Sequence, residues 1–453
     1  MPVAPGSPGD DGERTTLEAS CISAHLQLYH PGGTTPGRLQ ARPCVHGLRV
    51  CCVKRRTRQR PTRGLHMDRR RFLGAGSIAV ASPMLSGLGM PAAANASAPE
   101  SRRVNFASDG LGLDPAEYAA VLSQVVADGN FQPDNYTQGG IIRALETRFA
   151  RLLGKDDAIY LPTGTLANHL AVRKLAGNDR RVLVQAESHL YNDSGDCAQT
   201  LSGLNLVPLA DGASTPSFDE VERWLRRSDG GRVETRVGVI AIESPVRRRH
   251  HEMVDFDTLA RISRLARERG IRLHLDGARL FNLPLHSGHG LHAYGALFDT
   301  VYVSLWKHFN AGSGAILAGD AGFIEGLFHQ RRMFGGALPH AWPSAAVALR
   351  FVDGYLEDYA KSWQVADRLV ALLQDDGRFS FETLPNGTSR FFMTATGVDP
   401  AALRERLAAQ DVVLSHGHPD TGRFAMEVNA TLLRLPAEVL AARFIEAANG
   451  AAR

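Results

Sequence analysis

Two kinds of hydrophobic spacing alternate along most of the chain. Short, nearly continuous apolar runs are typical of buried strands, and they recur near residues 158–161, 181–185, 205–209, 236–242, 271–275, 299–304 and 313–318. Between them, apolar residues repeat every three or four positions, as in amphipathic helices, near residues 165–176, 193–202, 217–228, 255–269 and 320–333. This alternation predicts an α/β fold with a mainly parallel seven-stranded sheet that has helices on both faces.

The pattern changes at both ends of this region. Residues 99–113 look extended, and Asp114-Pro115 begins a helix that we expect to reach about Asp128, since proline suits the first helical position. Beyond residue 339 the pattern predicts two helices, a helix from Pro400, and short strands near residues 378–383, 388–395, 411–414 and 423–428. We therefore predict a large domain over residues 99–339 and a smaller C-terminal α+β domain over residues 340–453.

The first 98 residues do not resemble a folded domain. Residues 1–66 lack apolar periodicity and include a self-repelling basic run at 54–60, so we predict a disordered extension or a spurious one from an overextended reading frame. Residues 67–98 join Arg69-Arg70-Arg71-Phe72-Leu73 to a weakly apolar run and small residues, which resembles a twin-arginine signal peptide. Gly and Pro interrupt that run, which argues against a retained membrane helix. We expect a periplasmic or secreted protein without a membrane segment after cleavage, with a cytoplasmic protein as the alternative.

Charge and cysteine content narrow the function classes. Residues 1–98 hold 13 of the 51 Lys and Arg and 5 of the 47 Asp and Glu, so the remaining residues carry 38 basic and 42 acidic side chains. A mildly acidic body argues against a nucleic-acid partner. Only Cys197 lies in the body, so we expect no internal disulfide there, and Cys51-Cys52 lacks partners at metal-site spacing. We predict no metal site.

Asp276 and Lys307 each follow a predicted strand. The strand that contains Leu273 and Leu275 delivers Asp276 at its carboxyl end, where open α/β sheets place their ligands. Lys307 comes just after the strand over 299–304, and a glycine-rich run follows at 311–314. A pyridoxal phosphate enzyme needs this arrangement, because the lysine amine forms a Schiff base and the carboxylate keeps the pyridinium nitrogen protonated.

Each residue also has a simpler interpretation. An Asp at a strand end is commonly a turn or cap residue, and a lone Lys is commonly solvated. However, the chain has few lysines, namely Lys54, Lys155, Lys174, Lys307 and Lys361. Arginine cannot form a Schiff base, so a lysine between a buried strand and a glycine-rich loop indicates a chemical requirement.

The turn Pro162-Thr163-Gly164-Thr165-Leu166-Ala167-Asn168 leads from a strand into a helix. Free backbone amides and hydroxyls at the positive end of a helix can cradle a phosphate. Any helix N-cap can read similarly, so the turn supports the cofactor prediction only together with Asp276 and Lys307.

With these motifs in view, the chain from about Val104 onward resembles the threonine aldolase / aromatic amino acid β-eliminating lyase family of fold type I pyridoxal phosphate enzymes. The motifs that carry the resemblance are His274-Leu275-Asp276-Gly277-Ala278-Arg279-Leu280-Phe281-Asn282, the turn at 162–168, Ser108-Asp109, Ser188-His189, and Gly335-Gly336 after Arg331-Arg332. The resemblance implies a pyridoxal 5'-phosphate cofactor, an amino acid substrate, and a homodimer or homotetramer with sites completed across the interface. It also implies a lyase that cleaves the Cα–Cβ bond of a β-hydroxy amino acid into glycine and an aldehyde.

The resemblance further implies residue roles. Lys307 would hold the cofactor and carry a proton, Asp276 would pair with the ring nitrogen, and His189 would stack on the ring and take the substrate hydroxyl proton. The implied cofactor-binding residues are Thr163, Gly164, Thr165, His189, Asp276, Arg279 and Lys307. The implied substrate-binding residues are Ser108, Tyr136, Arg279 and Arg423.

The departures from the family pattern lie on the substrate side. Glu243-Ser244-Pro245-Val246 stands where the family has Glu-Asn-Thr-His, and the basic run 247–251 that follows would supply a replacement histidine, an anion-binding edge or only a solvated loop. Trp306-Lys307-His308 replaces Ser-Lys-Gly, and His340 replaces a more basic pair. Three alternatives to aldol cleavage therefore stay open: β-elimination, another amino acid reaction such as transamination, and a catalytically silent, cofactor-binding exported protein.

Overall fold

The computed structural model of the chain describes residues 102–129 and 131–452. The predicted extension at 1–66 and the predicted signal at 67–98 lie outside the described residues, so both stay predictions. Within the described residues, no helix is both long and apolar enough to span a membrane.

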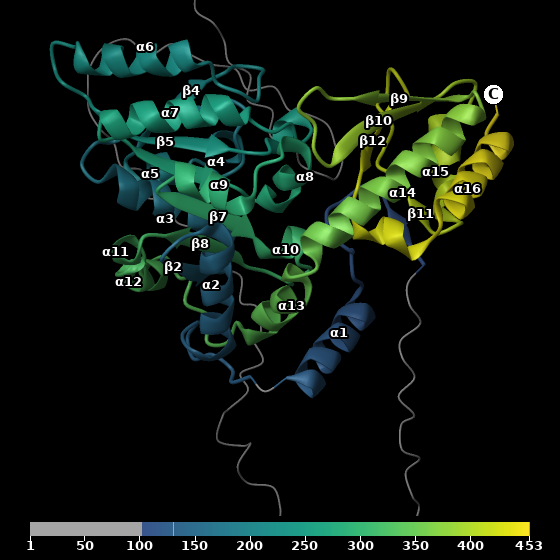
Figure 1. The fold of residues 1–453 in the computed structure, drawn as a ribbon, viewed down its shortest axis with the longest axis horizontal. Coiled ribbons are helices and arrows are strands. Elements are labelled where there is room, and N and C mark those ends of the chain that lie inside the picture. The colour runs from purple at the N-terminus through teal and green to yellow at the C-terminus, as the bar shows by residue number, and fades with distance from the viewer. Residues whose placement is uncertain (1–101, 130, 453) are drawn as a thin grey trace, which may run out of the picture. The chain divides into compact units, whose positions relative to one another are not determined.

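Strands and helices alternate along the described chain (Figure 1). The strands are β1 (Val104–Asn105), β2 (Asp157–Leu161), β3 (Arg181–Gln185), β4 (Asn205–Leu209), β5 (Val237–Glu243), β6 (Arg272–Asp276), β7 (Thr300–Ser304), β8 (Ala315–Gly319), β9 (Phe379–Thr383), β10 (Arg390–Ala395), β11 (Val412–Val413) and β12 (Phe424–Glu427). The α-helices are α1 (Pro115–Asp128), α2 (Gly140–Leu153), α3 (Gly164–Ala176), α4 (His189–Asn192), α5 (Cys197–Ser202), α6 (Phe218–Asp229), α7 (Phe256–Glu268), α8 (Leu283–Ser287), α9 (Leu291–Leu297), α10 (Leu305–His308), α11 (Ala321–Ile324), α12 (Leu327–Met333), α13 (Trp342–Val352), α14 (Tyr355–Asp375), α15 (Pro400–Ala408) and α16 (Ala437–Gly450). Short 3-10 turns are η2 (Arg247–Arg249), η3 (Leu280–Asn282) and η4 (Ala430–Arg434).

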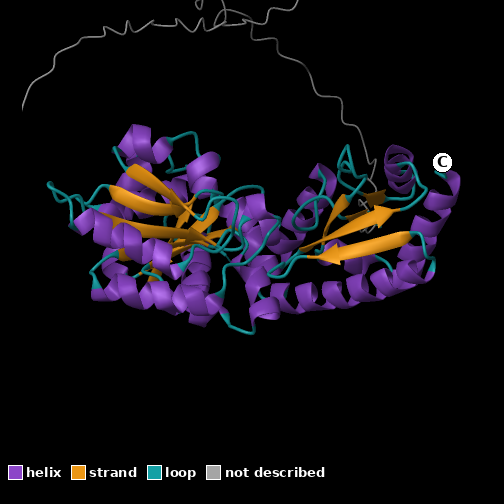
Figure 2. Cartoon of the chain, turned by 90° about the horizontal axis from the view of Figure 1, so that it is seen from above, coloured by secondary structure: helices purple, strands orange, loops and turns teal. Residues whose placement is uncertain are grey.

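The larger sheet has seven strands in the order β2-β8-β7-β6-β5-β3-β4, and helices lie on both of its sides (Figure 2). The neighbours β7-β6-β5-β3-β4 pair in parallel, which confirms the predicted α/β class and mainly parallel sheet. β8 alone runs antiparallel to its two neighbours. The segment between β7 and β8 is too short for a parallel crossover, so the chain must turn back.

Two predicted helices differ from the observed ones. Of the helix predicted over 193–202, only residues 197–202 are helical, as α5. The separate helix α4 lies before the predicted range, and Gly195 and Asp196 adopt left-handed backbone angles between α4 and α5. The segment over 320–333 forms α11 and α12, with Gly326 at a φ of 79° between them. A left-handed residue ends the helical hydrogen-bond ladder, and hydrophobic spacing alone does not reveal it.

A smaller sheet of three antiparallel strands, β12-β10-β9, forms from the C-terminal part. The strand predicted near 411–414 is outside this sheet, because β11 pairs in parallel with β1 from the start of the described chain. α14 and α16 pack against each other beside the small sheet (Figure 1). The start of the described chain, at β1, therefore pairs with a strand from the C-terminal part of the chain.

The buried apolar side chains form separate clusters around the two sheets. The largest cluster surrounds the seven-stranded sheet and includes Ala345 and Val352 of α13. A second cluster joins Val104 and Phe106 to α14, α16 and the three-stranded sheet. Hydrophobic packing thus groups α13 with the larger sheet, whereas the predicted boundary after residue 339 stays a prediction.

Candidate active site

A cavity of about 500 Å³ opens at the carboxyl ends of the central strands. Its lining comprises Pro162, Thr163, Gly164, Thr165, His189, Glu243, Arg247, Asp276, Ala278, Arg279, Tyr302, Trp306, Lys307, Gly312 and Ser313. The structure thus brings the seven residues predicted for the cofactor into one place, although they come from segments far apart in the sequence. This is the position at which parallel α/β sheets bind ligands.

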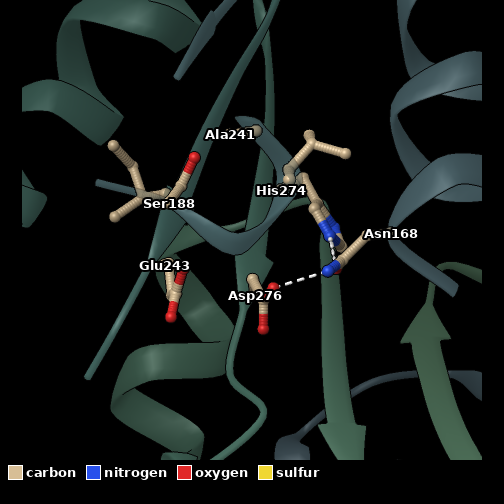
Figure 3. Close-up of a pocket in the computed structure, with 8 residues that line it drawn as sticks. Asn168, Ser188, Ala241, Glu243, His274 and Asp276 are labelled. Carbon is tan, nitrogen blue, oxygen red and sulfur yellow. Dashed lines mark hydrogen bonds between the residues drawn. The ribbon is translucent and has the colours of Figure 1, made fainter. Parts of the chain in front are cut away.

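A chain of hydrogen bonds holds Asp276 from behind (Figure 3). Asn168 Nδ2 donates to Asp276 Oδ2 at 2.5 Å, and Asn168 Oδ1 lies 2.9 Å from His274 Nε2. His274 Nδ1 in turn lies 2.8 Å from Thr300 Oγ1. Burial lowers the pKa of His274 to about 4, so the ring is neutral and its Nε2–H donates to Asn168. The network fixes the direction of the carboxylate.

Lys307 lies almost entirely buried at the cavity wall. Burial, and then the nearby Arg279 charge, lower the pKa of the Lys307 amine to about 8. Loss of hydration disfavours the ammonium form, so a useful share of the amine is an uncharged nucleophile near neutral pH. The Trp306 ring centroid is 5.5 Å from the amine, which places an aromatic face beside it.

The N-terminus of α3 contributes Thr163, Gly164 and Thr165 to the cavity. The Thr163 hydroxyl accepts the Leu166 N–H at 3.2 Å and so caps the helix. A Cβ on Gly164 would lie 1.9 Å from the Tyr302 hydroxyl, so the glycine is required for the buried Tyr302 to reach this turn. The helix dipole and the free amides of the first turn favour an anion here.

His189 begins α4 beside Asp276 and Lys307 in the cavity lining. Ser194 Oγ lies 3.1 Å from the His189 carbonyl oxygen and 3.2 Å from Nδ1. The carbonyl can only accept, so the single hydroxyl proton goes there and Nδ1–H donates to Oγ. Burial, more than the nearby Lys307 and Arg247 charges, lowers the pKa of His189. The ring is therefore neutral with Nε2 as a bare proton acceptor.

Glu243 is a buried carboxyl at the end of β5, paired in register with Asp276. It accepts the backbone N–H of His189 at 2.5 Å and that of Arg247 at 2.8 Å. Burial and the neighbouring Asp276 raise the pKa of Glu243 to about 7, against the opposing effect of those two N–H groups. The side chain ties two cavity segments together.

Arg279 is predicted to bind the substrate carboxylate, but in this structure it is already paired. Its Nε and Nη2 donate to the two carboxylate oxygens of Asp109, both at 2.7 Å. Both side chains are nearly inaccessible, with 6% and 8% exposed. Arg279 still lines the cavity, so a substrate carboxylate would meet its remaining Nη1 group or replace Asp109.

Three residues predicted to bind substrate lie outside this cavity lining. Ser108 accepts a hydrogen bond from Asn105 Nδ2 at 2.6 Å and is exposed. The exposed Tyr136 ring has the Arg332 guanidinium 5.2 Å from its centroid. Arg423 pairs with Glu382 at 2.7 Å and lies 3.8 Å over the Phe392 ring.

The residues of the basic run 247–251 lie in different environments. Arg247 lines the cavity, whereas His251 is fully buried with Nδ1 3.3 Å from Glu427 and 2.9 Å from Ser389. The run therefore places an arginine at the cavity, and no histidine from it is in the cavity lining.

His251 and Glu427 belong to a buried polar cluster next to Asp109. The three residues offer ligand atoms within 4.8 Å of one another. Arg279 holds both oxygens of Asp109, and Arg390 Nε donates to Glu427 at 2.5 Å. These contacts make the cluster an ion-pair network that joins the two sheets.

The cavity fits pyridoxal phosphate. It offers a buried lysine amine with a lowered pKa, a carboxylate oriented by Asn168, and an anion-favouring helix start in which Gly164 leaves no room for a Cβ. Lys307 would hold the group covalently, Asp276 would pair with its ring nitrogen, and residues 163–165 would hold its phosphate.

Sequence reasoning assigned no role to several residues of the site. Glu243 belongs to the motif at 243–246, but its position in register with Asp276 can be known only from the order of strands in the sheet. Asn168 and His274 also lay in quoted motifs, yet their link to Asp276 depends on α3 crossing behind β6. Tyr302 alone carried a usable signal, since the hydroxyl of a tyrosine in a buried strand needs a polar partner.

Comparison with known proteins places the chain in a family. The profile described as Beta-eliminating lyase matches residues 116–384. The chain is 27% identical over 291 residues to a low-specificity L-threonine aldolase from Candida albicans, covering 63% of this chain and 76% of that protein. It is 28% identical over 207 residues to one from Saccharomyces cerevisiae, covering 45% of this chain and 53% of that protein, about half of its length.

A solved structure shows the same architecture. A putative L-allo-threonine aldolase from Listeria monocytogenes superposes with a TM-score of 0.62 at 25% identity, covering 77% of this chain and 96% of that one. The fold type I architecture, the pyridoxal phosphate cofactor and the lyase class predicted from the sequence are thereby confirmed. Because the family profile spans more than half of its length, the chain belongs to the beta-eliminating lyase family of pyridoxal phosphate enzymes.

Proposed function

We propose that the protein cleaves the Cα–Cβ bond of a β-hydroxy amino acid and releases glycine and an aldehyde. One observation carries the proposal: a neutral histidine with a bare Nε2 lies in the same cavity as the buried lysine and the oriented aspartate. When bound, pyridoxal phosphate supplies an electron sink for the bond that breaks at Cα. Aldol cleavage additionally needs a base for the β-hydroxyl proton, and His189 supplies it.

The residues around His189 suit this proton transfer. Ser194 fixes the tautomer through Nδ1, and Glu243 holds the start of α4 through the His189 backbone N–H. Lys307, with its pKa near 8, can then deliver a proton to Cα, because its amine gains and loses protons near neutral pH. The proton lost from the hydroxyl and the proton gained at Cα thus have separate carriers.

Cleavage of threonine, allo-threonine and phenylserine by purified holoenzyme tests the proposal. We expect glycine and the matching aldehyde in equal amounts from at least one of them, and a 10²- to 10⁴-fold lower turnover in His189→Asn. Release of ammonia and a keto acid instead would show β-elimination and overturn aldol cleavage. Bound cofactor without any turnover would indicate the silent binding protein.

We also propose that the enzyme works as a homodimer or homotetramer. Tyr136 supports this, because it is 44% exposed and absent from the cavity lining of its own chain. In an oligomer it could complete the site of a partner copy. Mixing inactive Lys307→Ala with Tyr136→Ala should then restore up to about a quarter of the wild-type activity. Random pairing makes about half of the dimers mixed, and each mixed dimer has one intact site out of two. Light scattering that finds only monomer would overturn the proposal.

We further propose export through the twin-arginine route. Support comes from the sequence Arg69-Arg70-Arg71-Phe72-Leu73 and the small residues that follow it. Fractionation of cells that express the full chain should find the shortened protein outside the cytoplasm. A paired Arg69→Lys and Arg70→Lys change should keep it inside, and a protein that is exported regardless would refute this route.

A further inference from the structure

Arg247 is a cation in the cavity for which the proposed cleavage has no task. Among the described lining residues, the other cations are Lys307, which serves the cofactor, and Arg279, which the sequence resemblance assigns to the substrate α-carboxylate. Val246, beside it in the chain, is fully buried and apolar. Because Arg247 is in the cavity lining, the turn after β5 contributes a positively charged residue to the cavity.

Two contacts fix the position of Arg247. Its backbone N–H donates to Glu243 Oε1 at 2.8 Å, and its Nη2 donates to Asp193 Oδ2 at 2.5 Å. Asp193 is not in the cavity lining, and its other oxygen is 3.5 Å from Arg248. The guanidinium is held by one amino group, so Nε and Nη1 are left for another partner.

These contacts also place Arg247 relative to the reaction. Glu243 accepts the backbone N–H groups of both His189 and Arg247, so the two residues lie on either side of one carboxyl. In the proposed function His189 takes the proton from the hydroxyl on Cβ. Because His189, Arg247 and Arg279 line one cavity, a group attached to Cβ can extend from His189 toward Arg247 while the α-carboxylate lies at Arg279.

We propose that the substrate side chain ends in a second carboxylate and that Arg247 binds it. This inference rests on the proposed function and names its substrate class, the β-hydroxy amino dicarboxylic acids, of which 3-hydroxyaspartate is the smallest. Its Cα–Cβ bond breaks with the electron pair staying on Cα, the hydroxyl proton leaves to His189, and Cα gains a proton. The products are glycine and glyoxylate, with all atoms accounted for.

Kinetics of holoenzyme with 3-hydroxyaspartate and threonine test the assignment. We expect kcat/KM at least tenfold higher for 3-hydroxyaspartate. Arg247→Gln should lower that value roughly 10- to 100-fold, as expected for loss of a charge-assisted hydrogen bond, and leave the threonine value within about threefold. Arg248→Gln is the matched control, because Arg248 is on the same turn, contacts the same Asp193 and is absent from the cavity lining. Equal losses for both substrates in Arg247→Gln would overturn the proposal.

Binding gives a second measurement that does not need turnover. By calorimetry, wild-type holoenzyme should bind succinate at least tenfold more tightly than butyrate, and Arg247→Gln should abolish the difference. The affinity of Arg247→Gln apoenzyme for pyridoxal phosphate should stay within about threefold of wild type. A large drop would instead assign Arg247 to the cofactor phosphate and refute our proposal. If no hydroxy amino acid is cleaved, the proposed function fails, and the succinate preference still decides whether Arg247 binds a carboxylate.

Discussion

Two walls of the cavity are built in different ways: the cofactor wall, with Asp276 and Lys307, and the substrate wall, with Arg247 and Arg279. Behind the cofactor wall, a single line of hydrogen bonds runs from Asp276 through Asn168 and His274 to Thr300. All four residues belong to the larger sheet or to the helix that crosses it. On the substrate wall, Arg279 is paired with Asp109, which is 170 positions earlier in the chain. The next layer, Glu427, comes from the small sheet.

This difference bears on how each wall can vary. The cofactor wall depends on strand and helix positions that the whole sheet enforces, so its chemistry is set once the fold forms. The substrate wall depends on ion pairs between segments whose relative position is set by packing of the two sheets. A change of substrate therefore needs only a few changes on that wall, such as Val246-Arg247 after β5.

Loss of the cofactor lysine should have the largest effect. Lys307→Ala removes both the covalent hold on the cofactor and a proton carrier, so we expect turnover to fall by at least about 10³-fold. The visible absorbance of the purified holoenzyme should disappear or stop responding to glycine. Lys361→Ala is the control, because that lysine only pairs with Glu357 on the surface of α14, and it should leave both signals unchanged.

Removal of one partner from the buried ion pair should be the largest stability effect. Asp109→Ala leaves Arg279 charged and nearly inaccessible, and such changes cost about 3–5 kcal/mol in the free energy of unfolding. Urea unfolding of the apoenzyme measures it. A loss below about 1 kcal/mol would mean that water or another group replaces the carboxylate. The Arg279–Asp109 pair would then contribute little to holding the substrate wall in place.

Acid should destabilise the joint between the sheets through His251. Burial lowers the pKa of His251 to about 4, below the ordinary value of 6.5, so between those values the unfolded chain binds more protons than the folded one. The contribution of neutral His251 to the free energy of unfolding is therefore complete above about pH 6.5 and is lost as the pH falls toward 4. The contribution of His251 to the free energy of unfolding is on the order of 3 kcal/mol.

Comparison of variants isolates this contribution. His274, His286 and His308 also have pKa values lowered by burial, so the wild-type acid limb includes them. His251→Gln should flatten the pH dependence of urea unfolding between pH 6.5 and 4 relative to wild type. An unchanged acid limb would show that His251 does not titrate in this range.

The hydrogen-bond line behind Asp276 should give a graded, smaller effect. Asn168→Ala leaves Asp276 in place but free to turn, and loss of an orienting partner costs roughly 10- to 100-fold at comparable sites. We expect the loss mainly in kcat and a shifted pH profile. Thr300→Val, two bonds farther from Asp276, should cost less, and equal losses in both variants would argue for general destabilisation.

The cofactor wall was readable from the sequence because its residues sit at fixed places relative to strands. Asp276 ends β6, and Lys307 follows β7 by three residues, so hydrophobic spacing alone located both. Thr163, Gly164 and Thr165 likewise begin α3 after β2. The order of strands in the sheet was not needed to predict that these ends converge.

The substrate wall was not readable in this way. The pairing of Arg279 with Asp109, and of His251 with Glu427, joins residues about 170 positions apart, and no local pattern encodes such contacts. The reversal of β8 and the split at Gly326 had local causes, yet hydrophobic spacing does not report backbone angles. Arg247 could be proposed as an anion-binding edge, but only the fold shows that Arg248 is not in the lining.

Arg423 should give the smallest effect and is the sharpest test of the boundary between the walls. The sequence resemblance predicts that it binds the substrate carboxylate, whereas in the structure it pairs with the exposed Glu382 and covers the Phe392 ring. An exposed pair of this kind contributes at most about 1 kcal/mol, so Arg423→Ala should barely change the urea midpoint. We expect KM to change by less than about threefold, because Arg423 is not in the cavity lining. A tenfold rise in KM at unchanged stability would instead show that Arg423 reaches the substrate, and the small sheet would then have to close over the cavity during turnover.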